Sequence, residues 1–385
     1  MKICIVTNRF ARDEGQGRVN YEIAQYAAAQ GYQVTCLAHH VGTDLLQYPT
    51  LQWVRMPNAN TPVALLGNIV FLLSTARWLR RFGHRFDVVL TNGANTAYPA
   101  DINVVHFVQS AWRAAASSIP DAHAGYRGLY QQLYTNVGAL LERFIVPKAR
   151  IICAVSAKVK DELVDLGMPP SRMRVVHNGV DVQEFHPGTV SGTSLELPEG
   201  VPLGLFAGDI KTRRKNLDSV LHALQRVDGV HLAVAGGLAD SPFPNLAQRL
   251  GLADRVHFLG FRQDIPDLMR AADFFVFPSR YEACTLVLLE AMASGLPIIT
   301  AQTAGGAELV DNACGVVLDN PEDVDGITQA MRTLTEDVGV RQKMAHQARL
   351  TAESLTWKHM ARQYMELMDE VVAAKNGQGN ERGNA

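Results

Sequence analysis

Short apolar runs alternate with amphipathic stretches from the beginning of the chain. The apolar runs are four to six residues long, whereas a stretch such as residues 19–30 repeats its apolar positions at helical spacing. This alternation predicts strands joined by helices, and therefore βαβ units around a parallel sheet. The strands expected in the first half are Ile3–Thr7, Gln33–Ala38, Val88–Thr91, Asn103–Val108 and Ile151–Val155.

The same alternation starts again after residue 200, which indicates a second α/β domain of the same class. Residues 187–194 (PGTVSGTS), between the two halves, are rich in residues that break regular structure. We therefore predict an N-terminal domain over residues 1–182 and a C-terminal domain over residues 183–356. The strands expected in the second domain are Leu203–Ala207, His231–Ala235, Val256–Leu259, Phe274–Val276, Pro297–Thr300 and Gly315–Leu318.

Near the C-terminal end, apolar residues recur at helical spacing from Trp357 to Val371 and form one stripe. We expect a helix over residues 357–374 whose stripe packs against one of the domains. Residues 375–385 are polar and rich in glycine, and we expect them to be disordered.

Composition narrows the class of protein. With 385 residues, 47% of them hydrophobic and 19% charged, the chain has enough apolar material for two globular cores. Its five cysteines lie far apart without metal-binding spacing, which favours reduced thiols and a cytoplasmic protein. The apolar run at the N-terminus is too short for a signal peptide, and the run over residues 62–73 is too short to span a membrane.

The formal net charge of −2 gives no reason to expect a nucleic-acid partner. It conceals two oppositely charged halves. Residues 1–182 carry 18 Lys and Arg against 12 Asp and Glu, a net charge of +6, whereas the rest of the chain has a net charge of −8.

Residues 278–297 (PSRYEACTLVLLEAMASGLP) carry the most informative chemistry. They follow an expected strand, and Thr285 is a good N-cap for a short helix. The unpaired N–H groups of Leu286 and Val287 would then point out of the carboxyl end of the sheet. This arrangement predicts a diphosphate site.

Glu282 and Glu290 are placed to flank one ligand, because ionised carboxylates are strong acceptors for sugar or ribose hydroxyls. The alternative is that both are merely solvated. The two glutamates, separated by seven residues and followed by AMASGLP, resemble the E-x7-E signature of retaining family 4 glycosyltransferases. Residues 176–181 (VHNGVD), 260–264 (GFRQD) and 305–308 (GGAE) resemble further motifs of that family in the same order.

The resemblance implies the GT-B fold. This fold has two Rossmann-like domains whose parallel sheets face each other across a cleft, with a C-terminal helix crossing back to the N-terminal domain. The resemblance also implies that Glu290 holds the ribose hydroxyls, Glu282 a hydroxyl of the donor sugar, and the backbone of Leu286 and Val287 the diphosphate. The backbone near Arg262 would read the base.

The loop 208–216 (GDIKTRRKN) resembles the basic loop of the family but departs from it at one position. Lys215 matches the family's lysine, whereas Asp209 stands where an arginine is common. We expect Asp209 to point away from a diphosphate and Arg213 or Arg214 to supply the second positive charge. The alternative is a solvated basic turn.

Two further candidates lie in the N-terminal half. Gly15 and Gly17 open a helix, where missing side chains would allow close backbone approach to the donor phosphate or the acceptor; a plain turn is the alternative. His106 ends an expected strand where the family places an active-site histidine. The resemblance implies a hydrogen bond to a donor-sugar hydroxyl or to the acceptor, and a structural histidine is the alternative.

The function implied by the resemblance is retaining transfer of a hexosyl unit from a nucleotide diphosphate sugar to a glycan or lipid-linked acceptor. The setting would be the synthesis of cell-envelope polysaccharide or lipopolysaccharide. A UDP-sugar is the favoured donor and GDP-mannose the alternative. We expect no cofactor and no metal, because Lys215 and a neighbouring arginine would stabilise the leaving diphosphate. The formal DxD at residues 323–325 is better explained as the acidic start of a helix.

The basic N-terminal half suggests an anionic acceptor or contact with an anionic membrane. A cluster of arginines with one tryptophan follows the apolar residues 65–73, a composition typical of an interfacial helix. Tyrosines at four-residue spacing could line the same region. A core-packing helix with a solvated polar edge is the alternative, so contact with the inner face of the cytoplasmic membrane stays open. The residues concerned are Arg77, Trp78, Arg80, Arg81, Arg85, Tyr126, Tyr130 and Tyr134.

Two other classes of protein are alternatives. A nicotinamide-dependent dehydrogenase would explain the first glycines, but the third glycine of its fingerprint is missing and the second-half motifs stay unexplained. A GT-B-type sugar-nucleotide epimerase or phosphorylase, or a non-catalytic sugar-nucleotide-binding protein, is the other alternative. Detection of a transfer product would separate these from a transferase.

Overall fold

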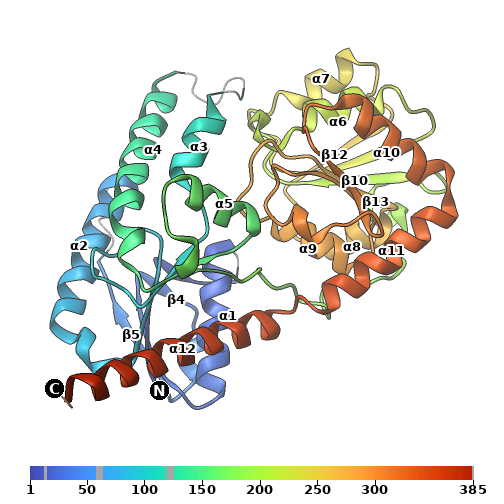
Figure 1. Ribbon diagram of the computed structural model, residues 1–385. Coiled ribbons are helices and arrows are strands. Elements are labelled where there is room, and N and C mark those ends of the chain that lie inside the picture. The colour runs from blue at the N-terminus through green and yellow to red at the C-terminus, as the bar shows by residue number, and fades with distance from the viewer. Residues whose placement is uncertain (13–14, 58–63, 118, 120–124, 384–385) are drawn as a thin grey trace. The chain divides into compact units, whose positions relative to one another are not determined.

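The computed structural model describes residues 1–12, 15–57, 64–117, 119 and 125–383. The chain divides into two compact units (Figure 1). Unit 1 comprises residues 1–113, 130–179 and 357–385, and unit 2 comprises residues 114–129 and 180–356. The main division after Gly179 lies three residues before the boundary expected at 182.

Unit 1 contains a seven-stranded sheet in which every neighbouring pair of strands is parallel. The strand order is β5-β3-β1-β6-β7-β8-β9. The central strands are buried on both faces, which explains why their sequences are continuous apolar runs. The strands are β1 (Lys2–Val6), β3 (Gln33–Ala38), β5 (Leu51–Arg55), β6 (Val88–Asn92), β7 (Ile102–Val105), β8 (Ile151–Ala154) and β9 (Met173–Val175); β2 (Arg9–Phe10) and β4 (His40–Val41) form a separate pair.

The helices of unit 1 cover both faces of this sheet. From β1 to β5 the chain adds strands in one direction along the sheet, and from β5 to β9 it adds them in the other. Because connections between parallel strands are right-handed, α1 covers one face of the sheet and α2, α4 and α5 cover the other. Helices α1 and α12 pack against each other (Figure 1). The helices are α1 (Gly15–Ala29), α2 (Ala64–Phe82), α3 (Gln109–Ala116), α4 (Gly125–Ile145), α5 (Ala157–Asp165) and α12 (Trp357–Gly383). Residues 114–116 of α3 and 125–129 of α4 fall in unit 2.

Unit 2 contains a six-stranded parallel sheet in the order β12-β11-β10-β13-β14-β15. Its core is one large cluster of buried side chains from both faces of the sheet. The strands are β10 (Leu203–Ala207), β11 (His231–Ala235), β12 (Val256–Gly260), β13 (Phe274–Phe277), β14 (Ile298–Ala301) and β15 (Gly315–Leu318). The helices are α6 (Leu217–Leu224), α7 (Phe243–Arg249), α8 (Ile265–Ala271), α9 (Leu286–Ala293), α10 (Val324–Glu336) and α11 (Val338–Glu353).

The prediction of two α/β units with parallel sheets is therefore confirmed. Strands β5 and β9 were not predicted. They form the two edges of the sheet, and their sequences, LQWVR and MRV, mix polar and apolar residues. None of the helices in the described part of the chain is both long and apolar enough to cross a membrane.

The last helix returns to unit 1 and packs against α1. Its apolar stripe is buried there, with Tyr364 and Met368 fully enclosed. The expectation of disorder from residue 375 is wrong for residues 375–383, which continue α12. Lys375 helps to explain the extension, since its Nζ donates hydrogen bonds to Asp101 Oδ2 at 2.8 Å and to the carbonyl of Asp87 at 2.8 Å.

We expect Tyr364→Ala to lower the free energy of unfolding of unit 1 by about 3–5 kcal/mol, because it removes a fully buried aromatic side chain from the contact between α12 and the sheet. Glu366→Ala on the exposed side of the same helix should change it by less than about 0.5 kcal/mol. Urea unfolding followed by circular dichroism measures both, and equal effects of the two variants would contradict the assigned packing.

Candidate active site

The carboxyl ends of the central strands of unit 2 surround a cavity of about 510 Å³. In an open parallel α/β sheet this edge is where ligands bind. The residues that line it come from the ends of β10 to β13, from the loops that follow and from α9. They are Ala207, Gly208, Asp209, Lys211, Lys215, Ala235, Gly236, Gly237, Phe261, Arg262, Ile265, Phe277, Val287 and Glu290.

The floor of the cavity depends on close approach between two loops. The N–H of Gly208 donates to the carbonyl of Ala235, and the N–H of Gly236 donates to the carbonyl of Gly260, each at 2.9 Å. A Cβ atom on Gly236 would lie only 2.3 Å from the carbonyl oxygen of Gly208. Glycine is therefore required at position 236 for the ends of β10 and β11 to approach.

The basic loop after β10 is fastened by Asn216. This buried residue adopts a left-handed conformation with φ of 64°, which asparagine tolerates better than most residues. Its Nδ2 donates to the carbonyls of Pro278 at 2.9 Å and Pro321 at 2.6 Å. The loop residues Arg213–Lys215 are thereby held against the end of β13.

Lys215 lies in the cavity and forms an ion pair with Glu282. Its Nζ also lies 5.1 Å from the centre of the Phe277 ring, within the range of a cation–π contact. Burial lowers the pKa of Lys215, and the negative charge of Glu282 opposes this shift. The site therefore holds a lysine with little water around it and one carboxylate as its counter-charge.

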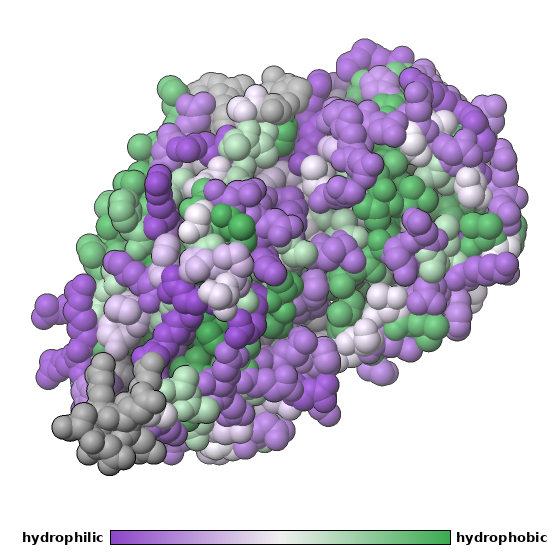
Figure 2. Space-filling model, in the orientation of Figure 1, coloured by the Kyte–Doolittle hydropathy of each residue, from purple (hydrophilic) through white to green (hydrophobic). Residues whose placement is uncertain are grey.

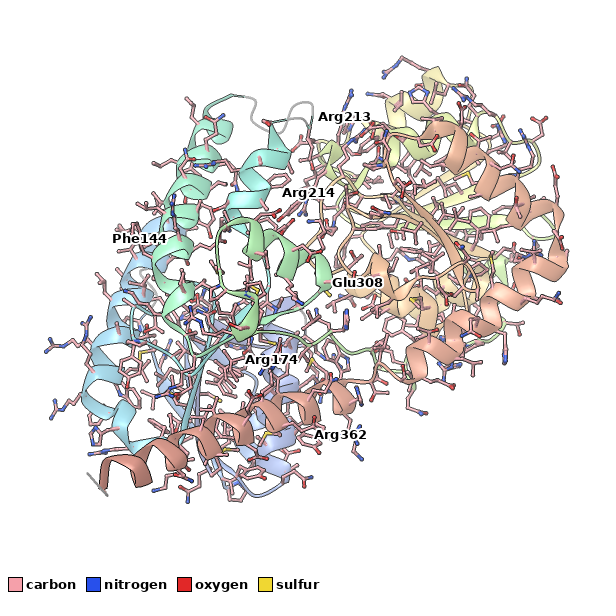
Figure 3. The ribbon with its side chains drawn as sticks, in the orientation of Figure 1. Phe144, Arg174, Arg213, Arg214, Glu308 and Arg362 are labelled. Atoms are coloured by element: carbon pink, nitrogen blue, oxygen red, sulfur yellow. The ribbon has the colours of Figure 1, made fainter. Side chains whose placement is uncertain are left out.

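Arg214 is the second cation near this carboxylate, with its guanidinium 3.5 Å from Glu282. Arg213 lies 3.9 Å from Asp218 instead, on the side of α6. Figure 3 shows both arginines on the loop that follows β10. Of the two candidates for the second positive charge, the structure places Arg214 beside the Lys215–Glu282 pair.

Asp209 lines the cavity, although we expected it to point away. Its carboxylate accepts a hydrogen bond from the N–H of Lys211 at 3.0 Å and so is engaged by its own loop. Asp209 is also close enough to Lys215 to raise its pKa, although more weakly than Glu282 does.

Sequence reasoning missed Arg280, which organises the loop from behind. Its guanidinium donates to Asp218 at 2.8 and 3.0 Å and to Glu322 at 2.9 Å, and it also donates to the carbonyl of Arg213. The side chain is 8% exposed, so these bonds are largely shielded from water. Arg280 stands two residues before Glu282, and that proximity was the only signal in the sequence.

Helix α9 begins after Thr285, as the sequence predicts. Thr285 is buried, and its hydroxyl makes no hydrogen bond among the described residues. Val287 and Glu290, on the first two turns, line the cavity, whereas Leu286 does not. The first two turns of α9 therefore line the same cavity as Lys215.

The loop that carries Glu282 is braced by residues 303–306. The N–H of Glu282 donates to the carbonyl of Thr303 at 3.1 Å, and the N–H of Gly305 donates to the carbonyl of Glu282 at 2.9 Å. A Cβ atom on Gly305 would lie 1.9 Å from the carbonyl oxygen of Ala283. The GGAE segment thus holds the backbone of the first glutamate, while Glu308 accepts a hydrogen bond from the N–H of Gly306.

At the mouth of the cavity lie Phe261 and Arg262. Arg262 donates to Asp264 at 2.7 Å, which fixes its side chain beside the cavity. Phe261 is 80% exposed, which is unusual for a phenylalanine next to a cavity. Sequence reasoning assigned the backbone near Arg262 to base recognition and gave the ring of Phe261 no role.

Unit 1 has its own cavity of about 200 Å³ near the end of β7. Amide side chains dominate its polar lining, and of the described residues that line it only Glu142 carries a carboxylate and none is Lys or Arg. Glu142 is buried and accepts hydrogen bonds from the N–H groups of Gln109 and Ser110. The polar lining residues are Asn8, Gln16, Asn68, Asn92, Asn95, His106, Gln109, Tyr134 and Glu142.

His106 lies in this second cavity, 2.8 Å from Asn92 through its Nε2. The amide of Asn92 is oriented by donating to the carbonyl of Val6 at 3.0 Å and to Asn20 at 2.9 Å. Its oxygen therefore faces His106, so Nε2 must donate and Nδ1 of the neutral ring is an acceptor. Burial lowers the pKa of His106 to about 4, which keeps the ring neutral at neutral pH.

The two N-terminal glycines do not line the cavity, whereas Gln16 between them does. Gly17 is buried, and a Cβ atom there would lie 3.2 Å from the carbonyl oxygen of Ala11. Close packing within unit 1 therefore explains Gly17. Gly15 is exposed at the beginning of α1.

Two family models match the chain and together cover most of it. The model described as "Glycosyltransferase Family 4" matches residues 14–184, and the model described as "Glycosyl transferases group 1" matches residues 201–337. The chain belongs to glycosyltransferase family 4.

Relatives of this family 4 chain include a D-inositol 3-phosphate glycosyltransferase of Salinispora tropica. It is 28% identical over 257 residues, which cover 60% of this chain and 53% of the relative. A UDP-Gal:alpha-D-GlcNAc-diphosphoundecaprenol alpha-1,3-galactosyltransferase of Escherichia coli is 30% identical over 199 residues, covering 49% of this chain and 51% of that protein. The matched part of the chain thus spans about half the length of these relatives.

Solved structures extend the likeness to almost the whole family 4 chain. A sucrose-phosphate synthase from Thermosynechococcus elongatus superposes with a TM-score of 0.75 at 18% identity, covering 97% of this chain and 99% of that one. HepE of Anabaena, solved in complex with UDP-glucose, superposes with a TM-score of 0.68 at 20% identity, covering 96% and 100%. At these identities the likeness concerns the fold, which is the expected GT-B fold.

We expect Gly236→Ala to distort the floor of the unit 2 cavity, because the added methyl group would lie 2.3 Å from a backbone oxygen. The variant should lower the thermal midpoint and weaken nucleotide binding. Gly237→Ala is the matched control, since the nearest atom to its Cβ would be Lys211 Cε at 3.9 Å. Calorimetry with nucleoside diphosphates compares the two, and equal affinities would contradict the close contact.

His106 should make unit 1 less stable as the pH falls. Its pKa is about 4 in the folded chain and roughly 6.5 when unfolded. Between these values the unfolded chain binds more protons, so the free energy of unfolding decreases from pH 7 to pH 5. His106→Asn should reduce this decrease, whereas His84→Asn at an exposed site should not. Urea unfolding at both pH values is the measurement, and an unchanged slope in His106→Asn would refute the assignment.

Proposed function

We propose that the chain transfers a hexosyl unit from a nucleotide diphosphate sugar to a glycan or lipid-linked acceptor. The observation that carries the proposal is the cavity of unit 2. It brings Lys215, Glu290 and the beginning of α9 together at the carboxyl ends of four parallel strands. A buried cation next to a helix N-terminus suits a diphosphate, and a carboxylate one turn further suits the ribose hydroxyls.

The ion pair between Lys215 and Glu282 could be replaced by an ion pair between Lys215 and the diphosphate of the donor. Glu282 is the counter-charge of Lys215 and Arg214. A diphosphate carries enough negative charge to take over both cations, because phosphate oxygens bind lysine and arginine well. Glu282 would then be available to accept a hydrogen bond from a hydroxyl of the donor sugar.

The nucleobase would lie at the mouth of the cavity. The exposed ring of Phe261 offers a face for stacking, and Arg262 is held beside it by Asp264. We favour a uridine diphosphate sugar over GDP-mannose. HepE of Anabaena, which shares the fold, was solved with UDP-glucose, and the name of the Escherichia coli relative specifies UDP-galactose.

For the reaction we propose retention at the anomeric carbon without a metal. The bond from this carbon to the diphosphate breaks, the bond to the acceptor oxygen forms on the same face, and the acceptor proton passes to the diphosphate. Lys215, Arg214 and the N-terminal end of α9 would stabilise the negative charge that develops on the leaving group. Among the described residues, no three His, Cys, Asp or Glu side chains gather as metal ligands would.

The cavity of unit 1 suits the hydroxyl groups of a sugar. Amides both donate and accept hydrogen bonds, and Nδ1 of neutral His106 accepts one. No lysine or arginine is found among the described residues that line it, so we propose a neutral sugar there. The name of the Escherichia coli relative specifies a sugar on a diphosphoundecaprenol lipid, and we propose an acceptor of this lipid-linked kind in envelope glycan or lipopolysaccharide synthesis.

We expect Lys215→Ala to lower kcat by about a hundredfold to a thousandfold, because it removes a positive charge from the leaving diphosphate. Glu290→Ala should weaken donor binding by about tenfold to a hundredfold through the loss of a charged hydrogen bond to the ribose. Lys343→Ala and Glu336→Ala, at exposed positions outside the cavity, are the matched controls.

The assay follows release of nucleoside diphosphate and the glycosylated product by mass spectrometry, with uridine, guanosine and adenosine diphosphate sugars as donors. Thermal unfolding of each variant shows whether it is folded. Turnover unchanged in both Lys215→Ala and Glu290→Ala would overturn the site. Conversion of the donor to its epimer without release of the nucleotide would show that the reaction is epimerisation and not transfer.

A further inference from the structure

Two buried asparagines join α1 to the sheet of unit 1. Asn20 of α1 is fully enclosed, and Asn92, at the end of β6, is 2% exposed. Nδ2 of Asn20 donates to Oδ1 of Asn92 at 3.0 Å, and Nδ2 of Asn92 donates to Oδ1 of Asn20 at 2.9 Å. A buried amide costs free energy unless its hydrogen bonds are made, and an apolar residue would fill either place without that cost. The pair therefore calls for an explanation beyond packing.

Backbone carbonyls fix the direction in which each of the two amides points. Nδ2 of Asn20 also donates to the carbonyl of Gln16 at 2.8 Å. Nδ2 of Asn92 also donates to the carbonyl of Val6 at 3.0 Å. A carbonyl can only accept, so a nitrogen must face it and the amide oxygen takes the opposite position. All N–H groups of the two amides are then used, and one lone pair of Asn92 Oδ1 is left.

His106 takes this remaining lone pair, since its Nε2 lies 2.8 Å from Asn92 Oδ1. Nε2 must therefore carry the proton, because otherwise two lone pairs would face each other at this distance. Burial lowers the pKa of His106 to about 4, so Nδ1 takes up no second proton at neutral pH. Among the described residues Nδ1 has no hydrogen-bond partner, although the ring lines the cavity of unit 1. The series of hydrogen bonds from α1 thus ends in an unpaired acceptor at the wall of a cavity.

Asn95 adds an unpaired donor to the same wall. It lines the cavity, and its buried Nδ2 makes no hydrogen bond within the described part of the chain. Buried polar groups without a partner are rare in native proteins, so both groups call for a partner from outside the chain. A sugar hydroxyl can both donate and accept, and it therefore suits this combination.

We infer that Asn20 is a positioning residue for His106. Through Asn92 it keeps the proton on Nε2, so that Nδ1 accepts a hydrogen bond from a hydroxyl of the sugar bound in the cavity of unit 1. Asn20 does not itself line this cavity, so it acts on the sugar only through the ring. The inference rests on the proposed function in that it takes the ligand of this cavity to be a sugar.

The tautomer of His106 separates this role from a merely structural one, in which the asparagines only attach α1 to the sheet. It is measured on the full chain with ¹⁵N-labelled histidine, because protonated and unprotonated ring nitrogens differ widely in chemical shift. The spectrum of His106→Asn identifies the signals of His106 among those of the 12 histidines. At neutral pH the wild type should be protonated on Nε2 alone.

Asn20→Leu removes the amide but keeps a side chain of similar shape. The amide of Asn92 is then free on one side and can turn its Nδ2 toward the ring, so part of the His106 population should carry the proton on Nδ1. A structural role alone would leave the tautomer unchanged.

The contact with the sugar is tested by adding the methyl glycosides of glucose, galactose, mannose and N-acetylglucosamine. At least one of them should shift the Nδ1 signal of the wild type, because a hydroxyl that donates to this nitrogen changes its chemical shift. Asn20→Leu should bind the same glycoside about fivefold to tenfold more weakly, which corresponds to the loss of one hydrogen bond.

Tyr21→Phe is the matched control. Tyr21 is the next residue of α1, is 1% exposed and donates a hydrogen bond to Asp44, so the variant also removes a contact between α1 and the rest of unit 1. It should change neither the tautomer of His106 nor the affinity for the glycoside. Thermal unfolding shows whether each variant is folded, and Asn20→Ser, which also lacks the amide, replaces Asn20→Leu if that variant is unfolded.

Three results would refute the inference. They are a wild-type ring protonated on Nδ1, a wild-type Nδ1 signal that none of the glycosides shifts, and a folded Asn20 variant whose tautomer and glycoside affinity equal those of the wild type. Equal effects of the Asn20 variant and Tyr21→Phe would also refute it, because the change would then come from the attachment of α1.

Affinity for uridine diphosphate keeps this outcome separate from the proposed function. Calorimetry should give the same affinity for the wild type and for the Asn20 variant, because the cavity of unit 2 is untouched. A chain that shows the expected tautomer and glycoside binding but transfers no sugar would leave the role of Asn20 standing and exclude the transferase. A tautomer that does not depend on Asn20, in a chain whose turnover depends on Lys215, would do the reverse.

Discussion

The ion pair of Lys215 with Glu282 is the interaction on which the rest of the donor site depends. Removing a lysine from water costs more than a single contact returns, so a buried cation needs a fixed counter-charge. Glu282 is fixed because residues 303–305 hold its backbone, and Lys215 because Asn216 fastens its loop to Pro278 and Pro321. In the proposed function a diphosphate would replace Glu282, and because the cations are already in place, little reorganisation would be needed during the reaction.

The Lys215–Glu282 ion pair also depends on loops that pack so closely that some positions have no room for a side chain. The loops after β10 and β11 approach so closely that a methyl group at Gly236 would overlap with a carbonyl oxygen, and a methyl group at Gly305 would lie even closer to the carbonyl oxygen of Ala283. Arg280 supports the loop from behind, because its guanidinium donates hydrogen bonds to Asp218, to Glu322 and to the carbonyl of Arg213. The site is thus a rigid arrangement of strand ends, and its chemistry comes from a few side chains placed on it.

The two parallel sheets could be predicted because buried strands are uniformly apolar, and the beginning of α9 because Thr285 is a residue typical of an N-cap. Arg280 could not be assigned, since its partners lie 62 and 42 residues away in the sequence. The exposed apolar residues of α4, Leu133, Leu140 and Phe144, show a different limit. Figure 2 shows hydrophobic surface over this helix. Helical spacing identifies an apolar face, but it does not tell whether that face meets the core or the solvent. Leu133 and Leu140 therefore resemble core residues until the fold places the sheet on the other side of the helix.

The same limit applies to charge. The net +6 of the N-terminal half suggested an anionic acceptor, yet the described lining of the unit 1 cavity includes no lysine or arginine. Three of the arginines, Arg77, Arg80 and Arg81, lie instead at exposed positions of α2, where no carboxylate of α2 or α4 neutralises them. A sum over the sequence cannot separate a charge that lines a cavity from one on the exterior of a helix. Position within the fold separates them, and here it assigns neutral hydrogen bonding to the cavity and positive charge to the exterior.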